Sequence, residues 1–394
     1  MRLGSPIFHL ELSMEQSEPV VLTDFPSSNA LATPQPTIGR QNGSSTARLP
    51  VADILRGLAA SWVFLFHASE GRHIDKLVRA VPETLASVVF SAGHLGVAVF
   101  FVLSGLVIAM SGQRCGDGLA PAASFLARRL VRLAPPYYAS LGVALAFLLL
   151  KMKAEAAGAI LPEPAAIAAH LLFMQDLMGI HALNSVYWTL CIEVQFYFVF
   201  CALMLLARWL GRGPLAGHAE LAVIGTACAV AALWPFRLAE DNAAWHTSFL
   251  PTWHLFLLGV ALHHVLKRGR SATALYIAYV VVLAVAAIVG RNMFTLAGIA
   301  TSVVLFGLSR WQPEAASGSI RLLTNLGLIS YSFYLLHNPI TGAAFNVTRR
   351  VAGDGIAAEL AGLMLSFCLC VLAAGISYVV IERPAIQWGR RFRT

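Results

Sequence analysis

Windows of about 20 apolar residues recur along the chain from Val51 almost to the C-terminus. The hydrocarbon core of a bilayer is roughly 30 Å thick, so one helical crossing takes about 20 apolar residues. Because 58% of the residues are hydrophobic and only 12% are charged, the composition excludes an ordinary soluble domain. The sequence therefore predicts an all-α fold, a polytopic membrane helical bundle.

Polar and helix-breaking residues divide the apolar stretches into about ten transmembrane helices. The predicted spans cover about 51–69, 86–110, 136–150, 187–207, 219–236, 248–266, 273–289, 294–309, 325–345 and 357–380. A weaker stretch, Ala165–Met178, has about 14 residues, which is short for a crossing. It is predicted to be a re-entrant or interfacial helix, with an eleventh span as the alternative.

Residues 1–48 differ from the rest, because they are rich in Ser, Thr, Pro, Gln and Asn and hold no apolar run long enough for a signal peptide. They are predicted to be a disordered polar tail before a transmembrane domain over residues 49–394. Lysine and arginine favour the loops on the side of the N-terminus, which predicts that both termini are cytoplasmic. This topology and contact with anionic membrane lipid explain the net charge of +8, and no nucleic-acid partner is expected.

The first predicted span contains Arg56 and His67, which lie 11 residues apart. At about 100° per residue this spacing is three turns plus roughly 20°, so both side chains project from one helix face, about 16 Å apart along the axis. Ionisable groups within a bilayer are costly and usually face the bundle interior or water. Although each residue alone can be an interfacial group, their shared face predicts that they line one polar cavity.

Six stretches in order resemble a known family. They are ILRGLAASWVFLFH (54–67), GHLGVAVFFVLSGLVIAMS (93–111), FLARRLVRLAPPYY (125–138), SVYWTLCIEVQFYFVF (185–200), LGLISYSFYLLHNPI (326–340) and SYVVIERPAIQWGRR (377–391). The first is similar to the R-x10-H signature of the bacterial acyltransferase-3 family, and the others are similar to later motifs of that family. The resemblance covers roughly residues 51–391, essentially the whole membrane portion.

This resemblance implies that residues 49–394 form a transmembrane acyltransferase domain in the bacterial inner (plasma) membrane. The implied reaction moves an acyl group, by analogy an acetyl group, from acyl-CoA to a hydroxyl of a glycan or another hydroxylated acceptor. Acetyl-CoA would then be the donor substrate. Two other classes stay open on the sequence alone, namely a transporter or flippase of a lipid-linked sugar and a silent sensor or scaffold.

Acyl transfer to an alcohol needs a base for the hydroxyl proton and stabilisation of the thioester oxyanion. His67 is predicted to be this base, because a neutral imidazole accepts a proton near pH 7. It can alternatively take the acyl group itself as a nucleophile. Glu193 lies in an apolar stretch and is predicted to be catalytic with His67 and Arg56, either orienting His67 or pairing with an arginine; a purely structural ion pair is the alternative.

Arg128, Arg129 and Arg132 lie in an amphipathic stretch that Pro135 and Pro136 are expected to end. Their guanidinium groups are predicted to bind the phosphates of coenzyme A, or alternatively anionic lipid.

Trp188, Tyr331, Tyr334 and His337 are predicted to bind substrate, with packing or buried hydrogen bonding as the alternative. The Pro339 that follows His337 is expected to kink its helix and leave backbone groups free for a ligand. Glu382 is predicted to be a cap or ion-pair partner at a helix end. The cysteines, histidines and carboxylates show no compact ligand spacing, so no metal is expected.

Overall fold

The computed structural model describes residues 49–112, 118–154, 161–238, 247–311 and 317–392, all within one compact unit, Ala47–Thr394. Over these ranges the regular structure is entirely helical, which confirms the predicted all-α membrane bundle. The tail predicted over residues 1–48 lies outside the described residues.

The long elements are α-helices. The helices are α1 (Pro50–Glu70), α2 (Asp75–Ala80), α3 (Glu83–Val89), α4 (Gly96–Gly112), α5 (Leu119–Ala154), α6 (Pro164–Leu171), α7 (Trp188–Leu210), α8 (Ala219–Ala231), α10 (Trp253–Arg268), α11 (Arg270–Val289), α12 (Met293–Gly307), α13 (Gly318–Ala352), α14 (Ile356–Ser377) and α15 (Arg383–Gly389). Two 3₁₀ turns, η1 (Ser91–Leu95) and η3 (Arg390–Phe392), and one π turn, η2 (Tyr378–Glu382), complete the described elements.

Each of the ten predicted spans overlaps one of these helices. Among the described residues, six helical segments are long and apolar enough to cross a membrane, namely Pro50–Glu70, Glu83–Gly112, Leu119–Lys153, Trp188–Leu210, Arg270–Val289 and Ile356–Phe392. Helices α8 and α12 are apolar but shorter, whereas α10 and α13 carry more polar residues. The total of ten spans therefore stays a prediction.

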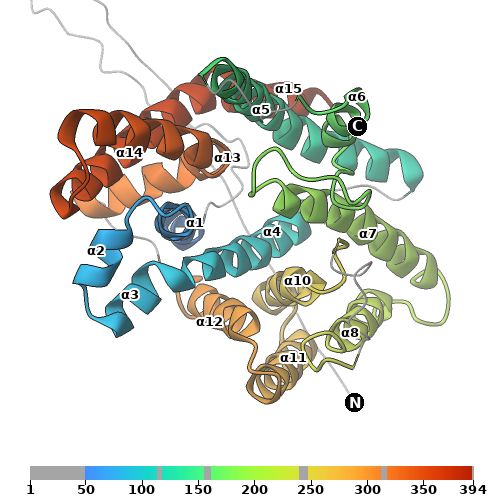
Figure 1. Ribbon diagram of the computed structural model, residues 1–394. Helices are drawn as coiled ribbons and strands as arrows, with labels where there is room; N and C mark the ends of the chain where they lie inside the picture. The colour runs from blue at the N-terminus through green and yellow to red at the C-terminus, as the bar shows by residue number, and fades with distance from the viewer. Residues whose placement is uncertain (1–48, 113–117, 155–160, 239–246, 312–316, 393–394) are drawn as a thin grey trace, which may run out of the picture. The chain divides into compact units, whose positions relative to one another are not determined.

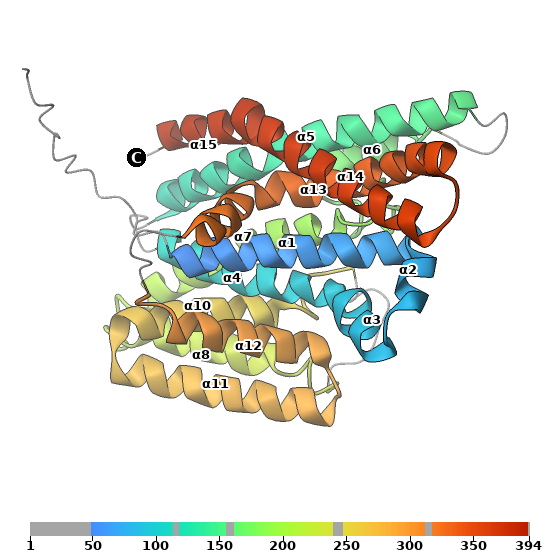
Figure 2. The same cartoon turned by 90° about the vertical axis from the view of Figure 1, so that its left-hand side faces the viewer.

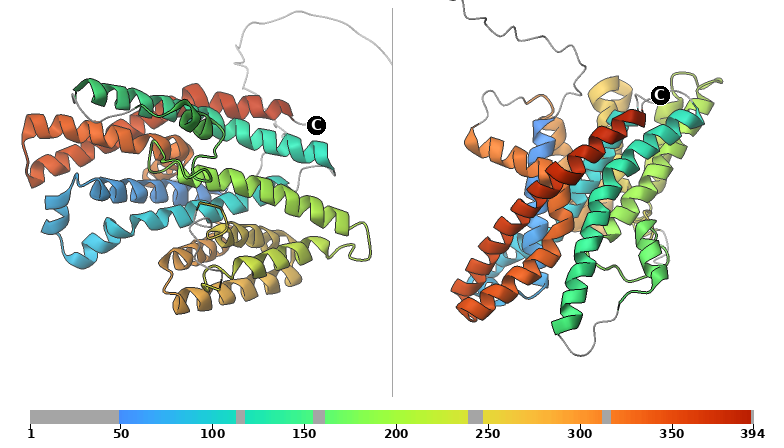
Figure 3. Two further views of the ribbon diagram at one scale, coloured as in Figure 1. Left: turned by 45° about the vertical axis from the view of Figure 1, so that its right-hand side comes forward. Right: turned by 90° about the horizontal axis from the view of Figure 1, so that it is seen from above.

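The helices run alongside one another in groups around α1 and α4 (Figures 1 and 2). In Figure 1, α13 and α14 lie above α1, whereas α8, α10, α11 and α12 gather below α4. Helix α1 packs against α13, and α4 packs against α10. Helix α15 and the η2 turn lie along α5 (Figure 3), so the C-terminal segment is part of the bundle.

The prediction that a helix ends at Pro135 and Pro136 is wrong, because both prolines lie inside α5, which is 36 residues long in total. A membrane helix tolerates proline where neighbouring groups satisfy the backbone that proline leaves exposed. Pro135 and Pro136 have no N–H to donate to the carbonyls of Val131 and Arg132, four residues earlier. Next to these carbonyls, the Tyr331 hydroxyl of α13 donates to the carbonyl of Leu133, which fastens this part of α5 to α13. The amphipathic stretch and the third predicted span are therefore one helix.

The backbone freed by Pro339 is likewise not available to a ligand. Proline has no N–H, so the carbonyl of Leu335, four residues earlier, loses its helical donor. That carbonyl accepts hydrogen bonds from Ser140 Oγ at 3.0 Å and from Asn184 Nδ2 at 3.1 Å. Helix α13 therefore continues from Gly318 to Ala352 and is fastened to α5 and to the segment before α7.

Close contact between α1 and α13 depends on glycine. A Cβ atom at Gly327 would overlap the backbone carbonyl of Asp53, and one at Gly57 would lie 2.8 Å from the carbonyl oxygen of Leu323. The absence of both side chains lets the two backbones touch. This contact holds together the two helices that carry Arg56, His67, Tyr334 and His337.

Candidate active site

A cavity lies among α1, α4, α5, α7, α13 and the η2 turn, with about 920 Å³ of atom-free space including its opening to solvent. Its wall is partly apolar and partly charged. The lining residues are Arg56, Val97, Phe100, Phe101, Ser104, Val107, Arg129, Arg132, Leu133, Thr189, Leu190, Glu193, Tyr197, Gly327, Leu328, Ser330, Tyr331, Tyr334 and Glu382. Six segments distant in the sequence therefore build one site.

The cavity contains three arginines with different surroundings. Arg129 donates to the carbonyl of Val107 at 2.8 Å and to the hydroxyl of Ser111, and its guanidinium lies 6.0 Å from the ring centre of Tyr197. Arg56 and Arg132 make no hydrogen bond to any of the described residues. Two guanidinium groups in the wall are therefore available for an anionic ligand.

Two carboxylates face these arginines across the cavity. Glu193 Oε1 accepts hydrogen bonds from Ser104 at 3.0 Å and from Tyr197 at 2.6 Å. Glu382, which is 2% exposed, accepts from Ser332 at 2.9 Å. With three guanidinium groups against two carboxylates, the charged groups of the wall carry a net positive charge when all are ionised.

The prediction that Glu193 orients His67 is wrong, because a different carboxylate occupies that position. Glu193 instead lies in the cavity with the arginines, where Arg56 and Arg129 interact with it electrostatically. Glu382 lies in the cavity wall and occupies the N-cap position of α15, although its side chain makes no capping hydrogen bond. Within the described ranges no arginine or lysine nitrogen lies within 4 Å of its carboxylate, and its electrostatic interaction with Arg132 and Arg56 acts over a longer distance.

Arg128 and Trp188, which the sequence predicts to bind the donor and the substrate, lie outside this cavity. Arg128 donates to Ser124 Oγ at 2.7 Å and to the carbonyl of Phe392 at 2.6 Å, which links α5 to the C-terminal segment. Trp188 is 36% exposed at the start of α7 and packs edge-on against Phe101. Neither residue lines the cavity.

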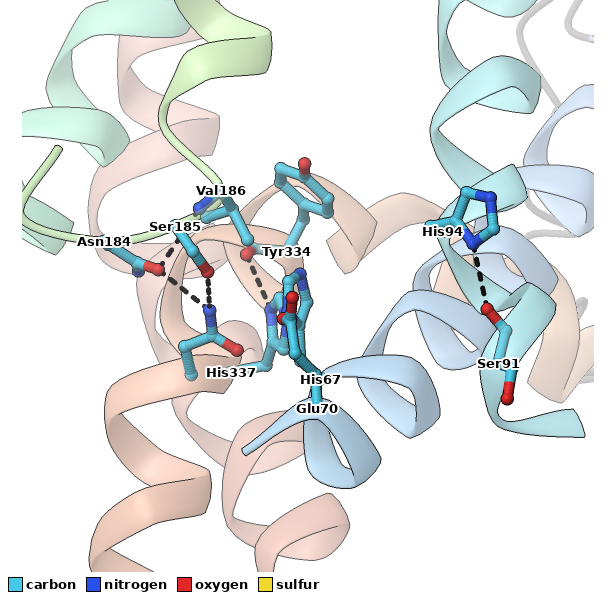
Figure 4. Close-up of polar contacts among 10 residues, drawn as sticks. His67, Glu70, Ser91, His94, Asn184, Ser185, Val186, Tyr334 and His337 are labelled. Atoms are coloured by element: carbon cyan, nitrogen blue, oxygen red, sulfur yellow. Dashed lines mark hydrogen bonds and ion pairs between the residues drawn. The ribbon is translucent and has the colours of Figure 1, made fainter. Parts of the chain in front are cut away.

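A second polar site lies at the far end of α1, around His67 (Figure 4). Its Nδ1 atom is 2.8 Å from Oε2 of Glu70, one helical turn further on. The side chain of His67 is 14% exposed and that of Glu70 is 56% exposed, so the pair reaches the outer edge of the bundle. The cavity lining includes Arg56 but not His67, and the expected common cavity for these two residues is therefore wrong.

His337 of α13 lies beside His67, with 5.2 Å between the ring centres. It is 1% exposed, and its Nδ1 atom donates to the backbone carbonyl of Tyr334 at 2.7 Å. Its Nε2 atom is buried and has no hydrogen-bond partner among the residues that the structure describes. The two histidines thus form a pair of which one member is edge-exposed and the other is enclosed.

Tyr334 connects the two sites. Its side chain lines the cavity, its hydroxyl lies 3.2 Å from Thr189 Oγ1, and its ring is 5.9 Å from that of His337. Phe100 packs edge-on against the same tyrosine at 5.5 Å. Tyr334 and its neighbours therefore separate the cavity that contains the three arginines (the arginine cavity) from His67 and His337 (the histidine pair).

Several residues of the site escape sequence reasoning. Glu70 is the carboxylate that contacts His67, and its only signal is the three-residue spacing that puts both on one helix face. Asn338 Nδ2 donates to Asn184 Oδ1 at 3.0 Å and to Ser185 Oγ at 2.8 Å, which places amide and hydroxyl groups next to His337. No pattern in the sequence indicates that these three residues meet.

Beyond α1, the chain turns back and is clamped to the α13–α14 hairpin. Glu359 is 5% exposed and accepts hydrogen bonds from the backbone N–H groups of Lys76 and Leu77. Lys76 Nζ lies 2.8 Å from Asp354 Oδ2, and the hydrogen bond and positive charge of Lys76 lower the pKa of Asp354. The turn after Glu70 is thus held by the hairpin whose first helix carries His337.

Within the described ranges, no group of three histidine, cysteine, aspartate or glutamate side chains is placed to hold a metal ion. Of the described cysteines, Cys191, Cys228 and Cys370 are buried, Cys201 is partly buried and Cys368 is exposed. The expectation that the protein uses no metal stays a prediction.

Comparison with known proteins supports the class that this fold and site define, a membrane-bound O-acyltransferase. A family model described as an acyltransferase domain matches residues 50–382. This match covers most of the chain, and the chain belongs to that family, acyltransferase-3, which the six motifs predicted.

The chain is similar along most of its length to three curated bacterial proteins. It is 27% identical to the exopolysaccharide production protein ExoZ of Rhizobium meliloti, over 84% of this chain and 96% of that protein. It is 25% identical to the acyltransferase MdmB of Streptomyces mycarofaciens, over 87% and 93%. It is 27% identical to a putative membrane-bound transacylase, BcsY, of Komagataeibacter xylinus, over 86% and 83%. No solved structure gives a significant match.

Proposed function

We propose that the protein transfers an acyl group from acyl-CoA to a hydroxyl of a polysaccharide, with the arginine cavity holding the donor and His67 acting as the base. The observation that carries this proposal is the arrangement of the two sites. A positively charged cavity suited to phosphates lies on one side of Tyr334, and a histidine–carboxylate pair lies on the other.

The donor site follows from the charges of the cavity. Guanidinium groups bind phosphate through paired hydrogen bonds. Arg56 and Arg132 make no hydrogen bond to the described residues, so a phosphate would not have to displace an existing partner. The partly apolar wall around Phe100 and Leu190 suits the pantetheine arm, which would lead the thioester toward Tyr334. Arg128 is not part of this donor site, because it binds the C-terminal segment.

The chemistry follows from the histidine–carboxylate pair. The Glu70 carboxylate can only accept, so the hydrogen of His67 lies on Nδ1 and the lone pair lies on Nε2. Nε2 takes the proton of the acceptor hydroxyl as its oxygen attacks the thioester carbon. The carbon–sulfur bond then breaks, and the thiolate of coenzyme A takes up the proton.

The acceptor and the cellular setting rest on analogy. One relative is named for exopolysaccharide production, which favours a polysaccharide acceptor here. Acetyl-CoA is the simplest donor that the resemblance implies. The distribution of lysine and arginine supports a multi-pass protein of the bacterial inner membrane with both termini cytoplasmic. In that orientation His67 and Glu70 lie on the extracytoplasmic side.

The test is acyl transfer by the purified full-length chain in liposomes, with acetyl-CoA as the donor and release of free coenzyme A as the readout. His67→Ala should lower turnover by about 10²–10⁴-fold, the usual range for a general base. His94→Ala is the matched control, because His94 is a nearby histidine whose ring hydrogen-bonds the carbonyl of Ser91 rather than a residue of the proposed site (Figure 4). Equal activity of the two variants would refute the proposed base. Absence of both acetyl-CoA binding and turnover in the wild type would favour a transporter instead.

A further inference from the structure

The Nε2 atom of His337 is a buried polar atom with no hydrogen-bond partner in the described part of the chain. Nearly all buried polar side-chain atoms in proteins make a hydrogen bond, and each exception needs an explanation. The surroundings of His337 are largely aromatic, with Phe333 stacked at 6.2 Å and Phe64 edge-on at 6.5 Å. Such a setting offers no solvent to replace a missing partner.

The hydrogen bond at the other ring nitrogen decides what Nε2 can do. Nδ1 of His337 lies 2.7 Å from the carbonyl oxygen of Tyr334, which can only accept, so Nδ1 carries the hydrogen. Nε2 of His337 is therefore an acceptor. Glu70 fixes His67 in the same way, with the hydrogen on Nδ1 and a lone pair on Nε2. In the resting protein neither Nε2 atom can donate to the other.

This relation changes when His67 takes a proton. Its Nε2 atom then becomes a donor, and the nearest enclosed acceptor is Nε2 of His337. A linear N–H···N bond of about 2.9 Å, with about 1.1 Å from each nitrogen to its ring centre, puts two imidazole centres about 5 Å apart. The observed separation is 5.2 Å, so a small reorientation of the rings is enough to form the bond.

We propose that His337 is a positioning residue that accepts a hydrogen bond from protonated His67 and holds the proton near the bundle interior until the leaving thiolate takes it. This inference rests on the proposed function. The proton leaves the acceptor oxygen for Nε2 of His67 as the new carbon–oxygen bond forms. It is then held between the two Nε2 atoms and ends on the sulfur of coenzyme A, so that ester and thiol are the only products.

Other titratable groups near the pair do not offer the same contact. Glu70 already occupies Nδ1 of His67, and Tyr334 uses its hydroxyl with Thr189. Cys370 of α14 lies 3.8 Å from the carbonyl of His337, and His94 of η1 contacts Phe66 rather than His67. His337 is thus the neighbour whose Nε2 lone pair can accept a hydrogen bond from protonated His67.

The test compares His337→Phe, which keeps an aromatic ring and removes the acceptor, with His337→Gln, which keeps an acceptor. The full-length protein in liposomes is assayed with acetyl-CoA from about pH 5 to 9, and coenzyme A release is fitted for kcat and KM. In His337→Phe, kcat should fall about tenfold at unchanged KM, and the pH of half-maximal activity on the acid limb should move about one unit lower. In this variant protonated His67 has no acceptor, so a lower pH is needed to protonate His67 and make it inactive as a base. His337→Gln should recover most of both values.

The position of the acid limb does not depend on how much variant protein is folded, so a merely structural role would leave it unchanged. A wild-type acid limb in His337→Phe overturns the inference, as does a His337→Gln variant no better than His337→Phe. Failure of the proposed function looks different, because His67→Ala would then be as active as the wild type.

Discussion

The arginine cavity and the histidine pair are both polar sites in an apolar bundle, but they are built in opposite ways. The cavity draws its lining from six segments and leaves Arg56 and Arg132 without hydrogen bonds among the described residues. The histidine pair comes from two touching helices, and its Nδ1 atoms are already engaged by Glu70 and by the Tyr334 carbonyl. This contrast teaches that one region is prepared to bind an anion, whereas the other is prepared to move a proton.

The comparison predicts that the two regions fail in different kinetic parameters. Arg56→Ala should raise KM for acetyl-CoA by about 10–100-fold with little change in kcat, because a hydrogen bond to a charged group is worth about 1.5–3 kcal/mol. Initial rates at varied acetyl-CoA measure this effect. Arg128→Ala is the matched control, since Arg128 lies on the same helix as Arg129 but outside the cavity, and its KM should stay within about twofold of the wild type. Equal changes in both variants would contradict the assigned donor site.

Glu70→Ala tests the other side of the comparison. It should lower kcat about tenfold and leave KM for acetyl-CoA unchanged, because His67 loses the group that fixes its orientation and tautomer. The effect is moderate, since the Glu70 side chain is 56% exposed and water can replace it in part. Glu83→Ala, which removes a carboxylate from α3, serves as the control. A rise in KM without a change in kcat would place Glu70 in donor binding instead.

Asn184→Ala probes the wall that the two regions share. Removing the amide takes one of two donors from the Leu335 carbonyl and should destabilise the protein by about 1–2 kcal/mol. Thermal unfolding in detergent gives the change in stability. Ser185→Ala, at an exposed neighbour, should change it by less than about 0.5 kcal/mol. An unfolding temperature equal to that of the wild type would show that Ser140 alone satisfies this carbonyl.

The smallest effect is expected at the outer clamp. Asp354 has a lowered pKa through Lys76, so its ion pair contributes stability above the pKa of the unfolded chain, and that contribution is lost as the pH falls through the folded value. Because the pair is solvent-exposed, Asp354→Asn should barely change the unfolding temperature at pH 7. Even this small difference should disappear in acid. A large loss at pH 7 would mean that the clamp controls the histidine pair more strongly than its exposure suggests.

The sequence predicts the all-α bundle well, because apolar windows report burial in lipid directly. It also predicts Arg56, His67, Arg129, Arg132, Tyr331, Tyr334 and His337 as residues of interest, and the structure gathers them around two adjoining sites. The sequence motifs do not predict the direction in which each side chain points. Arg128 and Arg129 are neighbours in the sequence, yet one contacts the C-terminal segment and the other lines the cavity.

The partners of the predicted residues are harder to anticipate than the residues themselves. An exposed glutamate such as Glu70 has no sequence signal that separates it from other polar residues at a helix end, so Glu193, which lies in an apolar stretch, is the more obvious partner for His67. Prolines in the sequence predict breaks, but Pro136 and Pro339 lie inside long helices. At Pro339, side chains from other segments satisfy the carbonyl that the proline leaves without its helical donor. Hydrogen bonds from distant segments to such a carbonyl depend on the tertiary structure, and the local sequence does not predict them.

The uninterrupted course of α5 has a mechanical consequence. A helix of 36 residues is about 54 Å long at 1.5 Å per residue, whereas the hydrocarbon core measures roughly 30 Å. The excess must be taken up by tilt or by projection beyond the lipid tails. Arg129 and Arg132 lie in the first half of that helix. Under the proposed function, a change in membrane thickness that alters the tilt of α5 would therefore also move two arginines of the donor site.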